Sequence, residues 1–573
     1  MPIIDTTDGS LVRKVISLAV PSILQTILSN CYALNDFLFV ARIKDEQLAS
    51  LCTAAISATV GMQFVLFAFH NIIPSGSNAY SSQYAGASNT AGLQSTFRAG
   101  FYASLIISIL VGLVGWLFID QIAHLTNSPP DVTKQIATFF AILVLASPAF
   151  GFMLLVDGFY RSNGDATTPL VLEICSLILN SICNYLFILE FNWGIAGAGF
   201  ATALSRLLPA LVGGYRLIQG KVGFPVSLRI RTWQDVREVW TVSKNLASIG
   251  VFESGSELIY GIVFTVLIRL TGDLGPAQQA GLGAGMRGLE WISFTISEGF
   301  LMAAMTSVGQ NIGAKLHDRA MKAAWICCVL SAAGAGIFGV LFLSMPMTIA
   351  KILSNDVDII KYCSIYLRAC GCIMALVGFE MACYGTFLGA GKARTVFLTS
   401  ATMNLLRIPL TILGLYGTAD FWLNLAWSFG FVSGDINADT GAIIHGGRVV
   451  DMVGKFDIVC WAIVATCVVK SLIYGCMLGY RQYSGLLFSD CTLTDEHGVS
   501  ADTVKPEESG PGDINATEAP EEWVFSDNPL IKAKTVTSLS GGTRSVQCSQ
   551  DDARAVEMST LRIDKSHHSQ RAE

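Results

Sequence analysis

The fold of this chain is decided by residues 158–188, which read GFYRSNGDATTPLVLEICSLILNSICNYLFI. The stretch begins as a polar turn bounded by Gly158 and Gly164 and continues as a long apolar run. The run carries Asn180 and Asn184, which lie four residues apart and therefore share one face of a helix. We infer a helix that holds two amides among Leu, Ile and Phe side chains.

The same pattern returns at residues 385–409, which read GTFLGAGKARTVFLTSATMNLLRIP. All corresponding positions are 227 residues apart (385−158, 391−164, 407−180, 310−83, 313−86). The corresponding pairs are Gly158 and Gly385, Gly164 and Gly391, Asn180 and Arg407, Gln83 and Gln310, and Gly86 and Gly313. Because separate places agree on one spacing, we conclude that the chain is a tandem duplication.

The composition is typical of a polytopic membrane protein. Hydrophobic residues make up 52% and charged residues only 14% of the 573 residues, too little charge to cover a soluble surface of this size. Neither a nucleic-acid partner nor a cleavable signal peptide is expected. The cysteines are scattered without metal-ligand spacing, and no nucleophile–base arrangement indicates an enzyme.

Twelve apolar windows are long enough to cross a bilayer. They lie near 15–40, 48–73, 97–119, 134–160, 169–190, 194–217, 244–270, 276–305, 320–344, 361–390, 395–416 and 456–480. Six spans in each half return the chain to its starting side, so both halves insert in the same orientation. We therefore predict an all-α membrane protein with two six-helix lobes related by a pseudo-two-fold axis along the membrane normal.

Lys and Arg in the short connections gather on one side, which predicts that both termini are cytoplasmic. The predicted parts are an N-lobe at 1–217, a cytoplasmic linker at 218–243, a C-lobe at 244–480 and a disordered cytoplasmic tail at 481–573. Within the C-lobe, residues 417–455 form a long outward loop rich in Phe and Trp, interpreted as a flap at the membrane interface. The host membrane, plasma or organellar, stays open, as do the roles of the loop and of the tail and its partners.

Several motifs resemble the multidrug and toxic compound extrusion (MATE) family, within the multidrug/oligosaccharidyl-lipid/polysaccharide flippase superfamily. They are PSILQTILSNCYALND (21–36), Gln83-x-x-Gly-Ala, Arg161-x-x-Gly-Asp-x-x-x-Pro, Asn180-x-x-x-Asn184-Tyr, GIAGAGFATALS (194–205), VGQNIGA (308–314) and Arg407-Ile-Pro-Leu. The resemblance implies twelve helices around a V-shaped central cavity and efflux of organic compounds against inward Na⁺ or H⁺ flow. The chain departs from one family branch in having Asn184 where that branch has Asp, and in its longer loop at 417–455.

Asp36 is the principal candidate for ion coupling. Placing an ionised carboxylate in an apolar helix costs about 2.5–3.5 kcal/mol, so the group must be protonated, paired or ion-bound during part of its cycle. With a rise of about 1.5 Å per residue, Asp36, Asn184 and Thr202 fall at one depth in the outer half of the N-lobe. With Asn180, these side chains offer the hard oxygen donors of a cation pocket.

The sequence leaves two alternatives open at this pocket. The amides and the hydroxyl are also suited to simple helix-to-helix hydrogen bonding. The coupling ion is H⁺ if burial keeps Asp36 protonated near neutral pH, or Na⁺ if Asp36, Asn180 and Asn184 hold the metal ion. No other cofactor is expected.

The second half offers acids for binding a cationic substrate. Glu253 and Glu257 lie one helical turn apart, and Glu257 and Glu380 are the stronger candidates. Arg287 and Glu290 are expected to pair with each other. Pro21 removes a backbone hydrogen bond from the first span, and we expect it to act as the hinge that moves Asp36 between outward and inward exposure.

The leading functional hypothesis is a monomeric secondary antiporter, embedded in the bilayer, that exports small organic compounds by alternating access. One alternative is a lipid-linked saccharide flippase, which needs several cavity Arg or Lys for phosphates. Intramembrane basic residues are few, chiefly Arg206, Arg287 and Arg407, which favours the antiporter. The other alternative, a membrane receptor or scaffold working through its tail, is disfavoured by the duplicated lobes.

Overall fold

The computed structural model describes residues 4–126, 128–220, 223–272, 274–416 and 451–484, together with three short strands between 435 and 449. The first half of the chain folds into helices with the bounds α1 (Leu11–Val40), α2 (Glu46–Gly86), α3 (Thr90–Leu117), α4 (Ile119–His124), α5 (Pro130–Leu145), α6 (Ser147–Ser162), α7 (Thr167–Asn184), η1 (Tyr185–Glu190) and α8 (Gly194–Ile218). We call this group of helices the N-lobe.

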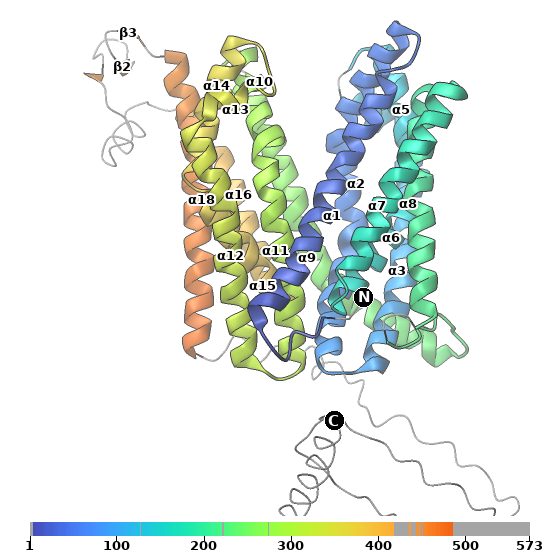
Figure 1. Cartoon of the computed structure of the whole chain (residues 1–573). Helices are drawn as coiled ribbons and strands as arrows, with labels where there is room; N and C mark the ends of the chain where they lie inside the picture. The colour runs from blue at the N-terminus through green and yellow to red at the C-terminus, as the bar shows by residue number, and fades with distance from the viewer. Residues whose placement is uncertain are drawn as a thin grey trace, which may run out of the picture. The chain divides into compact units, whose positions relative to one another are not determined.

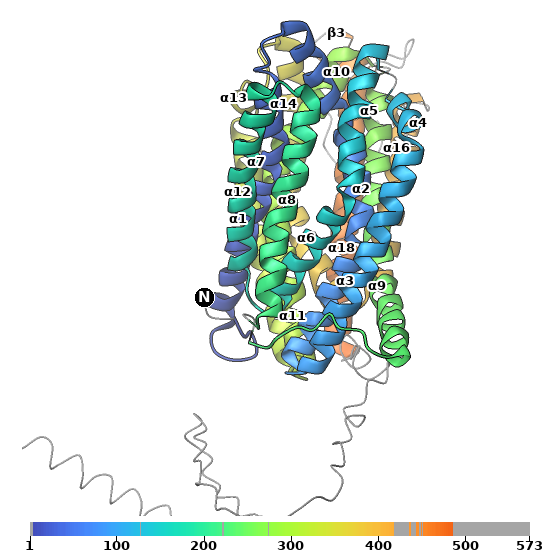
Figure 2. The same ribbon diagram turned by 90° about the vertical axis from the view of Figure 1, so that its right-hand side faces the viewer.

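The second half repeats the arrangement and forms the C-lobe. Its helices are α9 (Trp233–Gly272), α10 (Pro276–Ala284), η2 (Gly285–Glu290), α11 (Trp291–Gly313), α12 (His317–Ser344), α13 (Pro346–Ala350), α14 (Val357–Gly371), α15 (Met374–Gly389), α16 (Ala393–Tyr416) and α18 (Asp451–Ser484). Figure 1 shows the helices of the two lobes gathered into two bundles, and Figure 2 shows that the long helices run roughly parallel. The predicted all-helical architecture is confirmed.

Part of the predicted flap at 417–455 is a small antiparallel sheet. Its strands are β1 (Asp435–Ile436), β2 (Ile443–His445) and β3 (Arg448–Val449), in the order β1-β2-β3. Asp435 pairs with Ile444, which in turn pairs with Val449. The rest of the predicted flap up to residue 450 lies outside the described residues, as does the predicted tail from residue 485 onward.

The twelve predicted spans are also confirmed. In the described residues ten helices are long and apolar enough to cross a membrane, and two bent pairs bring the number to twelve if each pair is one span. The pairs are α5 with α6, bent by 52°, and α14 with α15, bent by 59°. Each pair is the fourth span of its lobe, so the break belongs to the duplicated fold. Large apolar side chains stay exposed on the long helices, as expected for surfaces that face lipid.

The predicted linker at 218–243 is not wholly a separate segment. Helix α9 begins at Trp233 and runs unbroken for 40 residues, so the second half of the linker is the first part of the seventh span. Charged residues lower the hydropathy there but do not stop a helix. Glu238 fixes this end to the N-lobe, because it accepts hydrogen bonds from Arg98 (2.9 Å) and Ser95 (2.5 Å).

The lobes are also in close contact where α2 and α11 end. A Cβ atom on Gly86 would lie 1.8 Å from the carbonyl oxygen of Gln310, and one on Gly313 would lie 1.8 Å from that of Gln83. These glycines do not make the chain reversals that follow α2 and α11, since neither has a positive φ. Left-handed backbone occurs instead at Ser88 (φ 55°) and at its counterpart in the second half, Lys315 (φ 60°). The glycines allow the two lobes to touch.

The turn between α6 and α7 is shorter than predicted, because α6 runs to Ser162 and Gly158 lies inside it, but the turn does contain Gly164. Gly164 has the positive φ of 85° that the reversal requires. Asp165 Oδ1 then accepts hydrogen bonds from the backbone N–H groups of Thr167 (3.1 Å) and Thr168 (2.9 Å), which caps the first turn of α7. This fixes the direction in which α7 enters the N-lobe.

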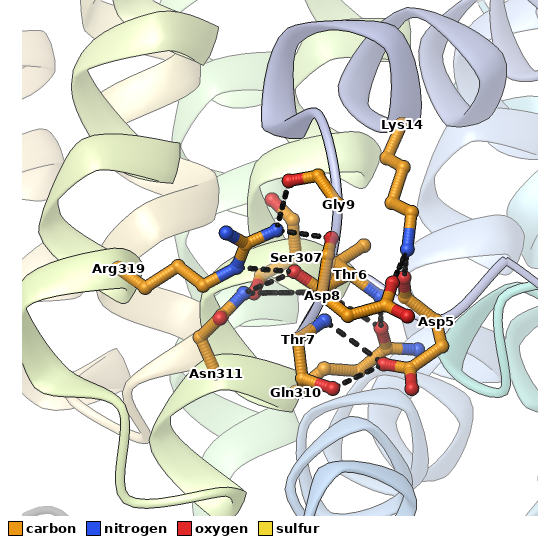
Figure 3. Close-up of polar contacts among 10 residues, drawn as sticks. All are labelled: Asp5, Thr6, Thr7, Asp8, Gly9, Lys14, Ser307, Gln310, Asn311 and Arg319. Atoms are coloured by element: carbon orange, nitrogen blue, oxygen red, sulfur yellow. Dashed lines mark hydrogen bonds and ion pairs between the residues drawn. The ribbon is translucent and has the colours of Figure 1, made fainter. Parts of the chain in front are cut away.

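A strap formed by residues 4–9 crosses this same end of the molecule (Figure 3). Ile4 N–H donates to the carbonyl of Gly164 (3.0 Å) in the N-lobe. Thr6 is fully buried and donates through N–H and Oγ1 to Gln310 Oε1 in the C-lobe (3.2 and 2.8 Å). Arg319 Nε donates to the carbonyl of Thr6 (2.9 Å). The strap therefore ties the two lobes together.

The strap is also fixed to the start of α1. Lys14 Nζ donates to the Asp8 carboxylate and to the Asp5 carbonyl. Through this hydrogen bond and its charge, the Lys14 ammonium holds the pKa of Asp8 below its usual value. Asp8 therefore stays ionised at neutral pH and keeps the strap folded against α1.

We expect Gly86→Ala to lower the midpoint of thermal unfolding in detergent, because the new methyl group must push the lobes apart. Overpacking of this kind costs about 1–3 kcal/mol. Gly61→Ala is the matched control, since it lies on the same helix and a Cβ there meets nothing within 4 Å. Equal midpoints for the two variants would contradict the close lobe contact.

Candidate functional site

A cavity of 510 Å³ lies between the lobes. Its lining contains eight carboxylic acids and four basic side chains among the described residues. The acids are Asp36, Asp157, Glu173, Glu253, Glu257, Glu290, Glu298 and Glu380, and the basic residues are Arg161, Arg206, Arg407 and Lys470. The excess of acids predicts a cavity that favours cations.

Asp36 is held in this lining by three side-chain hydrogen bonds. Its Oδ1 accepts hydrogen bonds from Asn184 Nδ2 (2.7 Å) and Asn180 Nδ2 (3.2 Å), and its Oδ2 accepts one from Thr202 Oγ1 (2.8 Å). All four side chains are buried. They come from α1, α7 and α8, so the structure brings together the four residues that the sequence analysis selected for one pocket.

The pocket has a cavity side and a closed side. Asp36 and Thr202 line the cavity, whereas Asn180 and Asn184 lie behind them. Asn35 Nδ2 donates to Asn180 Oδ1 (2.6 Å), and Ser181 Oγ donates to Asn35 Oδ1 (3.2 Å). These contacts orient the Asn180 amide so that its NH₂ group points at the carboxylate.

The donor set suits either a small hard cation or a proton. Three neutral donors stabilise the ionised carboxylate without cancelling its charge. Asn184 Oδ1 is buried and has no hydrogen-bond donor among the described residues, so one amide oxygen remains for a cation. Carboxylate, amide and hydroxyl oxygens are the ligands that hard cations prefer.

A buried ion pair stands beside this pocket. Arg206 Nη1 donates to both oxygens of Glu173 (3.0 and 2.9 Å), and the guanidinium lies 3.9 Å above the centre of the Tyr32 ring. The pair joins α8 to α7 and is neutral overall. Nearby, Gln25 Nε2 donates to Asp157 Oδ2 (2.8 Å), while Asp157 Oδ1 is buried without a partner in the described residues.

Two acids of α9, Glu253 and Glu257, face the cavity, and neither has a salt-bridge partner among the described residues. Glu253 and Glu257 both line it, one helical turn apart, as the sequence predicted. Glu257 Oε1 accepts a long hydrogen bond from Asn71 (3.4 Å), and the Oε2 atoms of both acids have no partner among the described residues. Glu298 on α11 lines the same space. In the described part of the chain, these three acids form no salt bridge.

Glu380 differs from its expected role as a free acid. Its Oε1 pairs with Lys470 Nζ at 2.6 Å, and its Oε2 accepts a hydrogen bond from Ser471 (3.5 Å). Its charge is therefore neutralised by α18. Glu290 accepts a hydrogen bond from the Tyr366 hydroxyl, whereas the side chain of Arg287, its predicted partner, lies outside the described residues.

Pro21 lies inside an unbroken α1. Before it, Leu11, Val15 and Leu18 lie in a buried cluster with side chains of the C-lobe helices α11, α12 and α15. After it, Asp36 bonds to α7 and α8 of the N-lobe. Helix α1 thus joins both lobes, and its contact with α11 continues past Pro21, since Asn30 Nδ2 donates to Thr295 Oγ1 (3.3 Å).

These features can be compared with known proteins. The family model MatE matches residues 21–186 and 254–413, more than half of the chain and both halves of the duplication. The chain belongs to the MatE family. Together with its apolar helices, this makes it a multi-pass membrane protein.

Among its relatives, this MatE chain is 21% identical over 425 residues to "Multidrug export protein MepA" of Staphylococcus saprophyticus, a match that covers 73% of this chain and 90% of the relative. It is 23% identical over 438 residues to "Probable multidrug resistance protein YpnP" of Bacillus subtilis, covering 75% and 94%.

Solved structures show the same fold. A MOP-superfamily transporter from Pyrococcus furiosus, described as having a binding pocket of reverse polarity, aligns with a TM-score of 0.70, 16% identity and coverage of 85% of this chain and 99% of that chain. A MATE family transporter in an outward-facing conformation aligns with a TM-score of 0.71, again at 16% identity and with coverage of 85% and 99%.

The sequence analysis of this MatE chain missed several site residues. Asn35, Asp157, Glu173 and Lys470 each carry a polar group inside a predicted span, which is a usable signal. Glu173 also lies seven residues before Asn180, so it shares the same helix face. What sequence could not supply is the partner of each charged group, because the rotation of each helix about its axis decides which side chains face one another.

We expect Glu173→Gln to destabilise the protein strongly, because it leaves the Arg206 guanidinium buried without a counter-charge. Breaking a buried pair in this way costs about 3–5 kcal/mol. Thermal unfolding in detergent measures the loss. In the double variant Glu173→Leu with Arg206→Leu, most of the stability should return, and failure to recover it would show that the pair is not the cause.

Proposed function

We propose that this chain is a secondary active transporter that exports organic compounds in exchange for H⁺ or Na⁺. The observation that carries the proposal is the Asp36 carboxylate, which faces the cavity and is held by Asn180, Asn184 and Thr202. The relatives named as multidrug export and resistance proteins support a drug-like cargo. No catalytic step is part of this proposal, and we propose that both termini are cytoplasmic.

The coupling ion acts at Asp36. A Na⁺ ion entering from the cavity meets the carboxylate first and then the free Oδ1 of Asn184. A proton instead neutralises the carboxylate, so the three hydrogen bonds to it weaken. In both cases the bonds that hold α1 to α7 and α8 change, and α1 is the helix that also packs on the C-lobe.

Alternating access then requires the closed end of the molecule to open. Gln83 Nε2 donates to the carbonyl of Gly389 (2.9 Å), Gln310 Nε2 donates to the carbonyl of Ser162 (3.0 Å), and the strap adds its own bonds to this end. All of these contacts must break if the cavity is to open there. We propose that bending of α1 near Pro21 accompanies this step.

A cationic substrate binds at Glu253, Glu257 and Glu298. Their carboxylates have no ion-pair partner in the described part of the chain, and aromatic residues such as Trp291 and Phe294 line the same space. Aromatic faces bind the flat bodies of organic cations. Glu380 contributes less, because Lys470 already neutralises it.

A lipid-linked saccharide flippase is the second candidate. Such a protein must hold phosphates, which favours an excess of Arg and Lys in the cavity. The described lining has twice as many acids as basic residues, and two of the four basic residues are in ion pairs. The charge of the cavity therefore supports the exporter.

Transport tests this proposal directly. We expect proteoliposomes containing the wild type to move the organic cation ethidium when a H⁺ or a Na⁺ gradient is imposed. In Asp36→Asn, gradient-driven movement should fall to the level of protein-free vesicles, because the coupling charge is lost. Asp120→Asn is the control, since Asp120 is exposed and outside the cavity lining. If gradient-driven transport is unchanged in Asp36→Asn, Asp36 is not the coupling residue.

The strap gives a second test. Thr6→Val combined with Arg319→Gln removes bonds between the strap and the C-lobe, so the closed end should open more often. Hydrogen–deuterium exchange at residues 83–90 and 310–316 should then rise several-fold. Thr7→Val is the matched control, because the side-chain hydrogen bond of Thr7 goes to Asp5 within the strap. Equal exchange in both variants would contradict a role for the strap in closure.

A further inference from the structure

Arg407 is a buried cation in the cavity wall that has no carboxylate within ion-pair distance in the described part of the chain. Its Nε donates to Thr466 Oγ1 (2.9 Å) and its Nη2 to Cys467 Sγ (2.8 Å), both neutral groups on α18. A buried charge inside a membrane is costly and is usually kept for function. The hydrogen bonds to α18 hold the guanidinium in place, but they do not neutralise its positive charge.

The duplication explains why the Arg407 guanidinium has no carboxylate partner in the described part of the chain. Arg407 is the counterpart of Asn180, which in the N-lobe donates to Asp36. At the same spacing of 227 (263−36), the counterpart of Asp36 is Val263, which is buried and apolar. The second lobe therefore has a cation where the first lobe has an amide, and a hydrocarbon where the first lobe has an acid.

The neighbouring charged side chains do not form a salt bridge with Arg407 in the described part of the chain. Lys470 lies one helical turn beyond Thr466 on α18, and its ammonium pairs with Glu380. Glu290 accepts a hydrogen bond from Tyr366, and it lies beyond ion-pair distance from Arg407. The cavity wall formed by α15, α16 and α18 thus contains two cationic groups, Arg407 and Lys470, and one acid, Glu380, that is paired with Lys470.

The acids Glu253 and Glu257 lie on α9, which packs against this wall through α16. Along α9, Glu253, Glu257 and Tyr260 follow one another on the face that lines the cavity, and α16 packs against α9. Glu253 and Tyr260 are separated by about 10 Å along the helix axis. The cavity therefore has an anionic part at Glu253 and Glu257 on α9 and a cationic part at Arg407 on α16, and these two helices pack against each other.

We propose that Arg407 is an anion-recognising subsite, with Lys470 as its cationic neighbour, and that the cargo includes amphoteric compounds carrying both a cationic nitrogen and a carboxylate. This inference rests on the proposed export function. The carboxylate of the cargo accepts hydrogen bonds from the remaining N–H groups of Arg407, while its cationic nitrogen lies toward Glu253 and Glu257. A guanidinium suits this role because its planar N–H groups match a carboxylate.

A matched pair of dyes tests the subsite. Rhodamine 110 carries a xanthylium cation and a free carboxylate, and rhodamine 123 is its methyl ester, so the two differ only in the anionic group. In proteoliposomes the wild type should transport both. Arg407→Gln should raise the KM for rhodamine 110 by about tenfold or more, because a charge-assisted hydrogen bond is lost. Its KM for rhodamine 123 should stay within about twofold, since the ester carries no charge for the guanidinium to meet.

Two further variants separate recognition from structure. Arg407→Lys keeps the charge and should restore part of the preference for rhodamine 110. Thr466→Val removes one of the two hydrogen bonds that hold the guanidinium to α18 and should weaken that preference less than Arg407→Gln does. Continued transport of rhodamine 123 shows that each variant is folded.

Several outcomes would overturn the subsite. If the wild type handles rhodamine 123 but rejects rhodamine 110, the cavity takes cations only and the export function survives without the subsite. If Arg407→Gln impairs both dyes equally, Arg407 is structural. If the wild type moves neither dye nor ethidium under any gradient, the proposed export function fails, and the subsite fails with it.

Discussion

The structure depends on keeping one carboxylate, Asp36, inside an apolar bundle. Three hydrogen bonds from α7 and α8 make this possible, and each requires its helix to lie at the right depth and rotation beside α1. The first turns of α1 pack in the core of the C-lobe. The acid therefore couples a local chemical state, ionised or neutralised, to the helix that connects the lobes.

The duplication preserved the backbone and changed the chemistry. The bent fourth spans, the short helices α4 and α13 and the reversals at Ser88 and Lys315 all recur, because they determine how each lobe packs. The polar residues diverged, since a site between two lobes needs different groups on its two sides. Asn180 and Arg407 show this most clearly, because they occupy equivalent positions but one is a neutral amide that donates to Asp36 and the other is a cation that donates to two neutral groups on α18.

Sequence reasoning could predict the spans and the Asp36 pocket but not the ion pairs. Hydrophobic length places a span, and the constant helix rise places Asp36, Asn184 and Thr202 at one depth. Neither reveals helix rotation, which decides that Lys470 meets Glu380 and that Arg206 meets Glu173. Hydropathy also missed the start of α9, because Asp235 and Glu238 look like linker residues although they extend the helix.

The closed end shows how such a molecule can still change state. Its lobes are joined by hydrogen bonds from Gln83, Gln310 and the strap, and each contributes only about 0.5–1.5 kcal/mol net. Contact at Gly86 and Gly313 adds close packing but little buried charge. A ligand shifts a two-state equilibrium only by its difference in affinity for the two states, and about 5.5 kcal/mol is enough to reverse a hundredfold bias. For the ion proposed at Asp36 to shift such an equilibrium, the closure must consist of many weak contacts rather than a few strong ones.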